Sequence, residues 1–194
     1  MPIRVFAAAI VSAVLMFIWG FVYWVVIGAG AQTLQAIPAA NELDLLAVMR
    51  SSEMVTGMYV YPFPADMNDQ QAAAEVERQA AEGPRFQLAY VKEGGPAMDG
   101  KLLGLGFAHM ALVALLTATL TALAAGALPT FGRRFAFVLL VGIIAAVWAN
   151  LGDVVWWMHS LRYAAGNIIF FVVEGALMAA AIAGIVKPIR EAGC

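Results

Sequence analysis

The chain has 194 residues, of which 63% are hydrophobic and only 12% are charged. Ordinary soluble domains have about 45–50% apolar and about 25% charged residues, so this composition excludes that class. The net charge of −2 provides no basic surface for nucleic acid. The single cysteine, Cys194, excludes an internal disulfide and a CxxC metal site.

Four apolar stretches are each long enough to cross about 30 Å of hydrocarbon. The expected spans cover residues 5–27, 102–128, 135–158 and 167–186. We therefore predict a mainly α fold: a four-helix transmembrane bundle with a small extracytoplasmic α/β insertion between spans 1 and 2. The expected parts are transmembrane helix 1 in 1–29, the extracytoplasmic segment in 30–101, and transmembrane helices 2–4 with a short cytoplasmic tail in 102–194.

The first span has an alternative interpretation as a signal peptide, because Ala29, Gly30 and Ala31 resemble a small-residue cleavage site. Its apolar run is longer than the usual 7–15 residues, and Arg4 alone supplies a charge before it. We interpret the span as an uncleaved anchor.

The distribution of basic residues beside the spans predicts the orientation of the chain. On one side of the membrane, the basic residues near the span ends are Arg4, Arg133, Arg134, Lys187 and Arg190. On the opposite side, the short loop has only Arg162. Both termini are therefore expected in the cytoplasm, and residues 30–101 outside it.

The long segment 30–101 shows the pattern of an α-β-α-β fold. A helix is expected from Asn41 as its N-cap, and a second, alanine-rich helix is expected from Asn68 or Asp69 to Gly83. The stretches "TGMYVYPFP" and "RFQLAYVKEGG" alternate like strands and are expected to pair. The segment has ten Asp or Glu against five Lys or Arg, and it has neither histidine nor cysteine.

A segment this small has little core of its own, so its aromatic strand faces need cover. The cover could come from its own helices, from the spans or from another protein. No catalytic constellation, cofactor motif or metal site is recognised in the chain, and we expect none.

Polar residues within the spans form the candidate site. Counting from the expected span ends places Glu174 and His109 about 10 Å below the outer edge, with Asn150 and Trp19 at a similar level. A carboxylate at that depth usually faces the bundle interior or a water-filled cavity. We expect Glu174 to meet His109, Asn150 or Trp19.

This candidate intramembrane polar layer has two interpretations. It is either a hydrogen-bonded cluster that fixes helix packing, or an ionisable pair, Glu174 with His109, in a proton, ion or ligand pathway. A haem site would need a second inward histidine, and His159 is expected too near the surface.

The stretch "NLGDVVWWMHS" is interpreted as the exit of the third helix at the outer interface. Asp153 and His159 lie near the expected membrane edge, and Trp156 and Trp157 resemble an aromatic belt. The third helix also has small residues on one face, Gly142, Ala146 and Ala149 or Asn150, and the fourth has Gly175, Ala179 or Ala180 and Gly184. Such faces allow close helix packing.

At "FIWGFVYW", "GMYVYPFP" and "AGIVKP" the chain resembles a group of small four-span bacterial inner-membrane proteins. The resemblance implies location and topology, and it transfers no catalytic residue. We expect a non-enzymatic accessory or scaffolding subunit of a larger membrane complex, in contact with the bilayer and with other subunits or itself as a homo-oligomer. The alternative is a small transporter, channel or lipid-binding protein using the polar layer.

Overall fold

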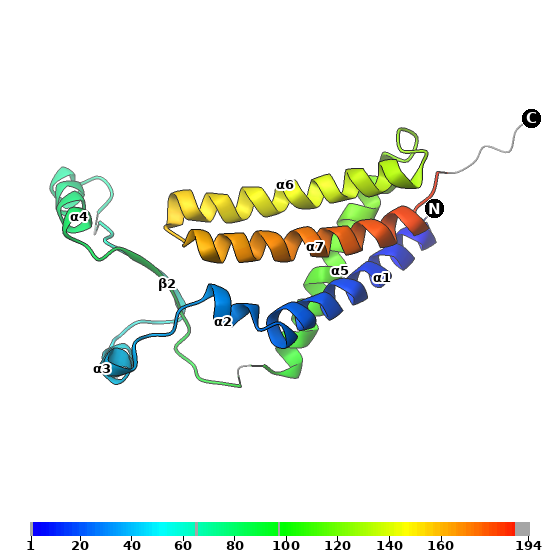
Figure 1. Ribbon diagram of the computed structural model, residues 1–194. Coiled ribbons are helices and arrows are strands. Elements are labelled where there is room, and N and C mark those ends of the chain that lie inside the picture. Colours follow the sequence, from blue (N-terminus) through cyan, green and yellow to red (C-terminus); the bar gives the residue numbers. More distant parts are fainter. Residues whose placement is uncertain (1, 65, 97, 189–194) are drawn as a thin grey trace, which may run out of the picture. The chain divides into compact units, whose positions relative to one another are not determined.

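The structure is a computed structural model that describes residues 2–64, 66–96 and 98–188 (Figure 1). Arg190 and Cys194 lie outside the described residues. The elements, in chain order, are α1 (Pro2–Phe21), the π-helical turn η1 (Val22–Val26), α2 (Ala29–Thr33), α3 (Ala39–Ser51), β1 (Gly57–Tyr61), α4 (Gln70–Glu82), β2 (Phe86–Tyr90), α5 (Gly100–Leu123), α6 (Phe131–Trp157) and α7 (Leu161–Ile185).

The chain divides into two compact units, which we describe separately. The interspan unit is Ala36–Pro96, and the membrane unit is formed by the chain before and after it. Within the described residues, four helices of the membrane unit are long and apolar enough to cross a bilayer: α1 continued by η1, α5, α6 and α7. The predicted four-span, mainly helical membrane protein is confirmed.

The ends of the spans differ from the expected ones because polar side chains cap the helices earlier. The Ser160 hydroxyl accepts a hydrogen bond from the Tyr163 N–H at 3.2 Å, so α7 begins at Leu161 rather than near Asn167. Thr130 caps α6 in the same way, and Asp99 caps α5. Side chains that accept from the first free N–H groups are the usual start of a helix.

The four long helices pack mainly in the order α6, α7, α1, α5, with fewer contacts from α5 to α6 and α7 (Figure 1). One core cluster joins all four helices and is rich in alanine. Its buried members include Ala8 and Ala9 of α1, Ala114, Ala118 and Ala122 of α5, Val138 of α6, and Met178, Ala179 and Ile182 of α7. Small side chains let the helix backbones approach closely.

The helices α6 and α7 approach closely at Gly142 and Gly175. A Cβ built on Gly142 would lie 3.4 Å from the Cα of Gly175, so the expected small-residue contact is confirmed there. Only some of the other residues on the two expected small-residue faces are buried between helices. Ala179 and Asn150 are buried, whereas Gly184 is exposed and has no neighbour within 4 Å of an added Cβ.

An aromatic cluster joins α1 and η1 to α7 near Gly166. Tyr23 is buried, and its hydroxyl donates to the Gly166 carbonyl at 2.8 Å. Phe170 stacks on Trp19 and contacts Tyr23 and Trp24. The cluster places Tyr23 inside the bundle, where its hydroxyl finds a carbonyl of α7.

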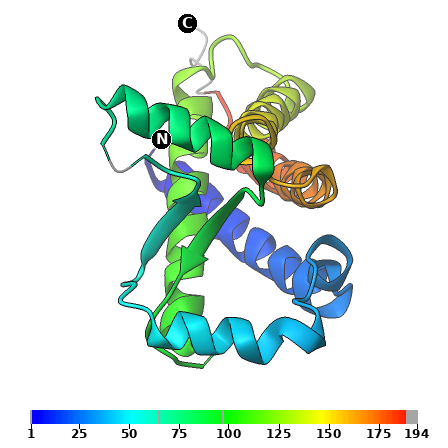
Figure 2. The ribbon, with the colours of Figure 1, turned by 90° about the vertical axis from the view of Figure 1, so that its left-hand side faces the viewer.

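In the interspan unit, β1 and β2 form a two-stranded antiparallel sheet, with α4 at one end and α3 at the other (Figure 2). Tyr59 pairs with Leu88 and Tyr61 with Phe86, which confirms the predicted pairing. Residues directly opposite in such a pair share a face of the sheet. One face is therefore aromatic, with Tyr61 stacked on Phe86 at a ring separation of 5.5 Å.

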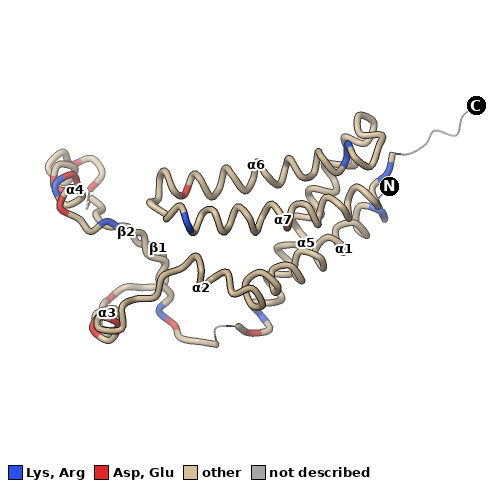
Figure 3. Tube along the Cα trace, viewed as in Figure 1, with Lys and Arg blue, Asp and Glu red and all other residues tan. Residues whose placement is uncertain are grey.

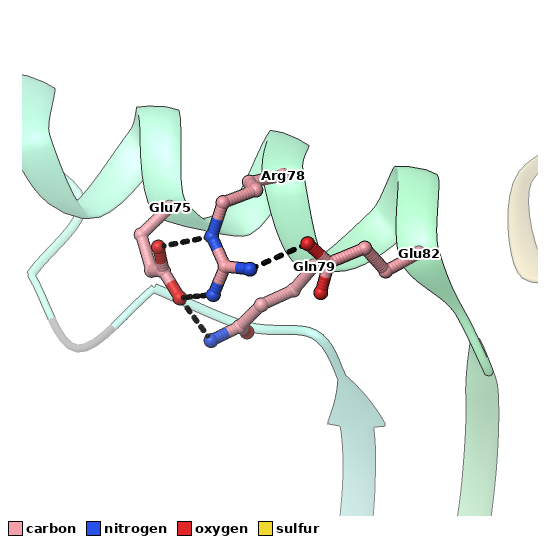
Figure 4. A network of polar contacts seen from close by, with 4 residues as sticks. All are labelled: Glu75, Arg78, Gln79 and Glu82. Atoms are coloured by element: carbon pink, nitrogen blue, oxygen red, sulfur yellow. Dashed lines mark hydrogen bonds and ion pairs between the residues drawn. The ribbon is translucent and has the colours of Figure 1, made fainter.

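The two interspan helices are stabilised locally. Asp69 caps α4, as expected, whereas α3 begins after Pro38 without a side-chain cap, so the predicted cap at Asn41 is wrong. On α4, Arg78 bridges Glu75 and Glu82 (Figure 4). Hydrogen bonds from Arg78, and then from Gln79, lower the pKa of the exposed Glu75 to about 2.

One end of the core is held by Arg134, a buried arginine of α6. Its Nε donates to the Ala183 carbonyl in the last turn of α7 at 3.1 Å. Its Nη1 donates to the carbonyls of Leu128 and Pro129, in the turn between α5 and α6, at 3.0 and 3.1 Å. The last carbonyls of a helix have no partner within the helix, so one guanidinium satisfies the end of α7 and the turn together.

We expect Arg134→Lys to lower the free energy of unfolding by about 1–3 kcal/mol, because an ammonium group cannot reproduce the planar fork of donors. Thermal unfolding in detergent, followed by circular dichroism, would measure the change. Arg133→Lys is the matched control, since Arg133 is the exposed neighbour on the same helix turn. Equal effects of the two substitutions would contradict a specific role for the buried guanidinium.

Candidate functional site

Charged residues are sparse along the long helices and gather near helix ends and in the interspan unit (Figure 3). Glu174 is an exception, because it lies near the middle of α7. Counted from Leu161, Glu174 lies about 20 Å along the helix axis, whereas the expected 10 Å was counted from Asn167. The difference follows from the earlier start of α7 at its Ser160 cap.

Glu174 is buried, with 7% of its surface exposed. It lies one helical turn from Phe170 and one turn from Met178, and both of these residues pack against α1 residues. Residues four apart lie on the same face of a helix, so Glu174 belongs to the face of α7 that meets α1. The next residue, Gly175, faces α6 through Gly142.

No hydrogen bond or ion pair joins Glu174 to another side chain among the described residues. The three residues expected to meet it have other surroundings. Trp19 donates its Nε1–H to the Phe170 carbonyl at 3.1 Å. Asn150, 6% exposed, donates to the Ala146 carbonyl of its own helix at 2.8 Å. His109 is exposed on α5.

The structure therefore does not bring the candidate polar layer together as one directly bonded cluster. Trp19 is linked to Glu174 only indirectly, through one main-chain carbonyl. Its Nε1–H binds the Phe170 carbonyl, which is also the expected acceptor of the Glu174 N–H within the helix. The pairing of Glu174 with His109 has no direct contact to support it. Counting the depth of each residue along its span does not indicate the face of the helix from which its side chain projects.

A common chemistry explains which polar groups find partners. Helix N–H groups are already used by the helix, whereas each carbonyl has a second lone pair for a side-chain donor. The donors Trp19, Tyr23, Asn150 and Arg134 all bind main-chain carbonyls. An ionised carboxylate is only an acceptor, so in that form Glu174 has no such solution.

The residues assigned to the outer interface lie at the end of α6. Met158 ends the helix in a left-handed conformation, and the His159 N–H donates to the Asp153 carbonyl at 3.2 Å. His159 Nδ1 lies 3.8 Å from an Asp153 carboxylate oxygen. Trp156 and Trp157 are 77% and 45% exposed, as residues of an aromatic belt would be.

A shallow depression of about 460 Å³ lies beside His159. It is lined by Thr33, Leu34, Gln35, His159, Ser160 and Tyr163. The tip of α2 reaches it because Thr33 packs on Gly166, where an added Cβ would lie 2.4 Å from the Thr33 Cγ2. In the part of the chain that the structure describes, no group of three or more His, Cys, Asp and Glu could hold a metal ion.

Three important buried residues were not recognised from the sequence. Arg134 was counted only as a charge for orientation, and Tyr23 was not singled out. Ser12 of α1 is fully buried, and its Oγ has no hydrogen-bond partner among the described residues. The pair "RR" gave no signal of which arginine turns inward, because that depends on the position of the end of α7.

No family model, curated protein sequence or solved structure matches this chain. The resemblance to small bacterial inner-membrane proteins is supported only at the level of four long apolar helices. The chain is therefore described as a four-span integral membrane protein.

We expect Glu174→Leu and Glu174→Gln to leave thermal stability unchanged or to raise it. Leucine removes a buried acceptor that receives no direct side-chain bond, and glutamine adds an amide donor for a helix carbonyl. Trp19→Phe should lower the free energy of unfolding by about 0.5–1.5 kcal/mol, because it removes one hydrogen bond. Thermal unfolding in detergent would compare the three variants. Strong destabilisation by Glu174→Gln would show that the carboxylate is held by an interaction specific to its charge.

Proposed function

We propose that the chain is a non-enzymatic accessory or scaffolding subunit of a larger membrane complex. The observation that carries the proposal is the exposure of the interspan unit: none of its described residues is buried. On its aromatic sheet face, Tyr61 and Phe86 remain 39% and 45% exposed, although the Tyr90 hydroxyl donates to the Met49 carbonyl of α3 at 3.2 Å. A two-stranded sheet is at best marginally stable without further packing. A binding partner would supply that packing.

The proposal includes a location. The basic residues beside the spans favour cytoplasmic termini and an extracytoplasmic interspan unit in a bacterial inner membrane. Lys187 is exposed and Arg133 is exposed, as residues facing an aqueous side would be. Arg134, which is buried on helix carbonyls, contributes less to the free charge of that side than the sequence count assumed.

Purification of the tagged full chain in mild detergent, at its native expression level, tests the subunit role. We expect a different chain in fixed stoichiometry, identified by mass spectrometry. Tyr61→Ala combined with Phe86→Ala should weaken that association, because it removes the stacked pair of the aromatic face. Met67→Ala is the control, since Met67 is 76% exposed and lies outside both strands.

A preparation that contains no other chain, under conditions that keep the protein folded, would contradict the subunit role. Equal loss of the associated chain in Met67→Ala would contradict the assignment of the aromatic face as the surface that binds that chain.

A second candidate function, a proton or cation pathway, is favoured by the buried carboxylate of Glu174. An acceptor that receives no side-chain hydrogen bond is available to a proton or a cation. In liposomes containing the purified protein and a pH-sensitive dye, Glu174→Gln should abolish flux. Asp153→Asn, at the exposed end of α6, should preserve it. Unchanged flux in Glu174→Gln would exclude this function for Glu174.

A further inference from the structure

Glu174 is buried on the face of α7 that meets α1, and it forms no ion pair among the described residues. An isolated charge in apolar surroundings is costly, so a buried ionisable group without a partner of opposite charge tends to exist in its neutral form. The form that Glu174 takes therefore depends on the groups that α1, α5 and α6 bring near it.

The face of α1 that packs on α7 is neutral. The bonds of Trp19 and Tyr23 to α7 set an antiparallel register, which places Ser12 about 5 Å along the helix axis from the level of Glu174. Ser12 is fully buried with an unbonded hydroxyl, and it offers a dipole but no charge. The only charged residue of α1, Arg4, is exposed and lies about 12 Å beyond Ser12.

The other long helices bring no positive charge to Glu174 either. The nearest buried cation is Arg134, whose Nε donates to the Ala183 carbonyl, about 13 Å along α7 from Glu174. The other charged or titratable residues of these helices are exposed or lie near helix ends: Lys101 and His109 on α5, Arg133 and Asp153 on α6, and Arg162 and Tyr163 on α7.

These surroundings suit a proton better than a metal cation. Calcium takes about 6–8 oxygen ligands and magnesium requires an octahedral shell. Near Glu174, the Phe170 carbonyl already accepts from Trp19, and the Asn150 amide is bonded to its own helix. Among the described residues, no group of three or more His, Cys, Asp and Glu could hold a metal ion. A proton needs only one carboxyl oxygen.

We propose that Glu174 is a proton-binding site and that its carboxyl group is the neutral acid in the folded protein at neutral pH. The carboxyl O–H then donates to a main-chain carbonyl, which is the arrangement that Trp19, Tyr23 and Asn150 adopt. A neutral acid has the donor that a carboxylate lacks.

This inference deepens the pathway function proposed above, because it names the proton rather than a metal cation as the ligand of Glu174. It rests on that function for the choice of the site, but it is tested without flux. A carboxyl group that holds its proton in a chain without flux would support the inference and contradict the pathway. Flux through a chain in which Glu174 is ionised would do the opposite.

Infrared spectroscopy of the full chain, in bilayers of ether-linked lipids that have no ester carbonyl, tests the protonation of Glu174. A protonated carboxyl group has a carbonyl stretch that a carboxylate lacks, and exposed carboxyl groups are ionised at neutral pH. The wild-type chain should show this band at neutral pH, and Glu174→Gln should lose it. Asp153→Asn, at the end of α6, is the matched control and should retain it.

Labelling the glutamate carboxyl groups with ¹³C should shift the band in the unmutated chain, so the assignment to a glutamate does not depend on the folding of a variant. Addition of sodium, potassium, calcium or magnesium chloride at constant pH should leave the band unchanged, as should choline chloride at the same ionic strength.

The proposal would be overturned by the absence of the band at neutral pH, by its persistence in Glu174→Gln, or by its equal loss in Asp153→Asn. Loss of the band on addition of one of the metal salts, but not of choline chloride, would also overturn it, because a metal cation would then displace the proton.

Discussion

The requirement that main-chain polar groups be satisfied inside the hydrocarbon region governs the structure of the membrane unit. It enforces four long helices, since a helix satisfies its own N–H groups within one segment. It also decides where side-chain donors go, because only carbonyls have free capacity. Tyr23, Asn150 and Arg134 come from different parts of the chain, and each ends on a main-chain carbonyl.

The same requirement isolates Glu174. A carboxylate needs donors, and the helix N–H groups around it are already committed to the helix. Trp19 donates to a carbonyl one turn away rather than to the carboxylate. Burial without a direct donor distinguishes Glu174 from the other buried polar residues with known partners, and this contrast is the physical basis of the alternative pathway function.

The interspan unit has the opposite property. Its hydrogen bonds include the Glu75–Arg78–Glu82 network within α4 and the bond from the Lys92 N–H to the Thr56 hydroxyl at 3.0 Å, which joins the two ends of the hairpin segment. The Thr56 hydroxyl in turn donates to Glu93 and lowers the pKa of that carboxyl. These contacts specify elements but bury no residue. The absence of a buried core among its described residues is the basis of the proposed association with another chain.

The sequence by itself determined the four spans and the pairing of β1 with β2, because apolar length and strand alternation are local properties. The start of α4 followed from the cap recognised at Asp69, whereas the start of α7 was missed with the Ser160 cap and the cap predicted at Asn41 is not used. Tertiary structure alone decided that Arg134 is buried, that His109 remains exposed on α5, and at which of the expected small residues α6 and α7 meet. Depth along a helix can be counted from sequence, but the face a residue presents depends on which helix packs beside it and at what rotation.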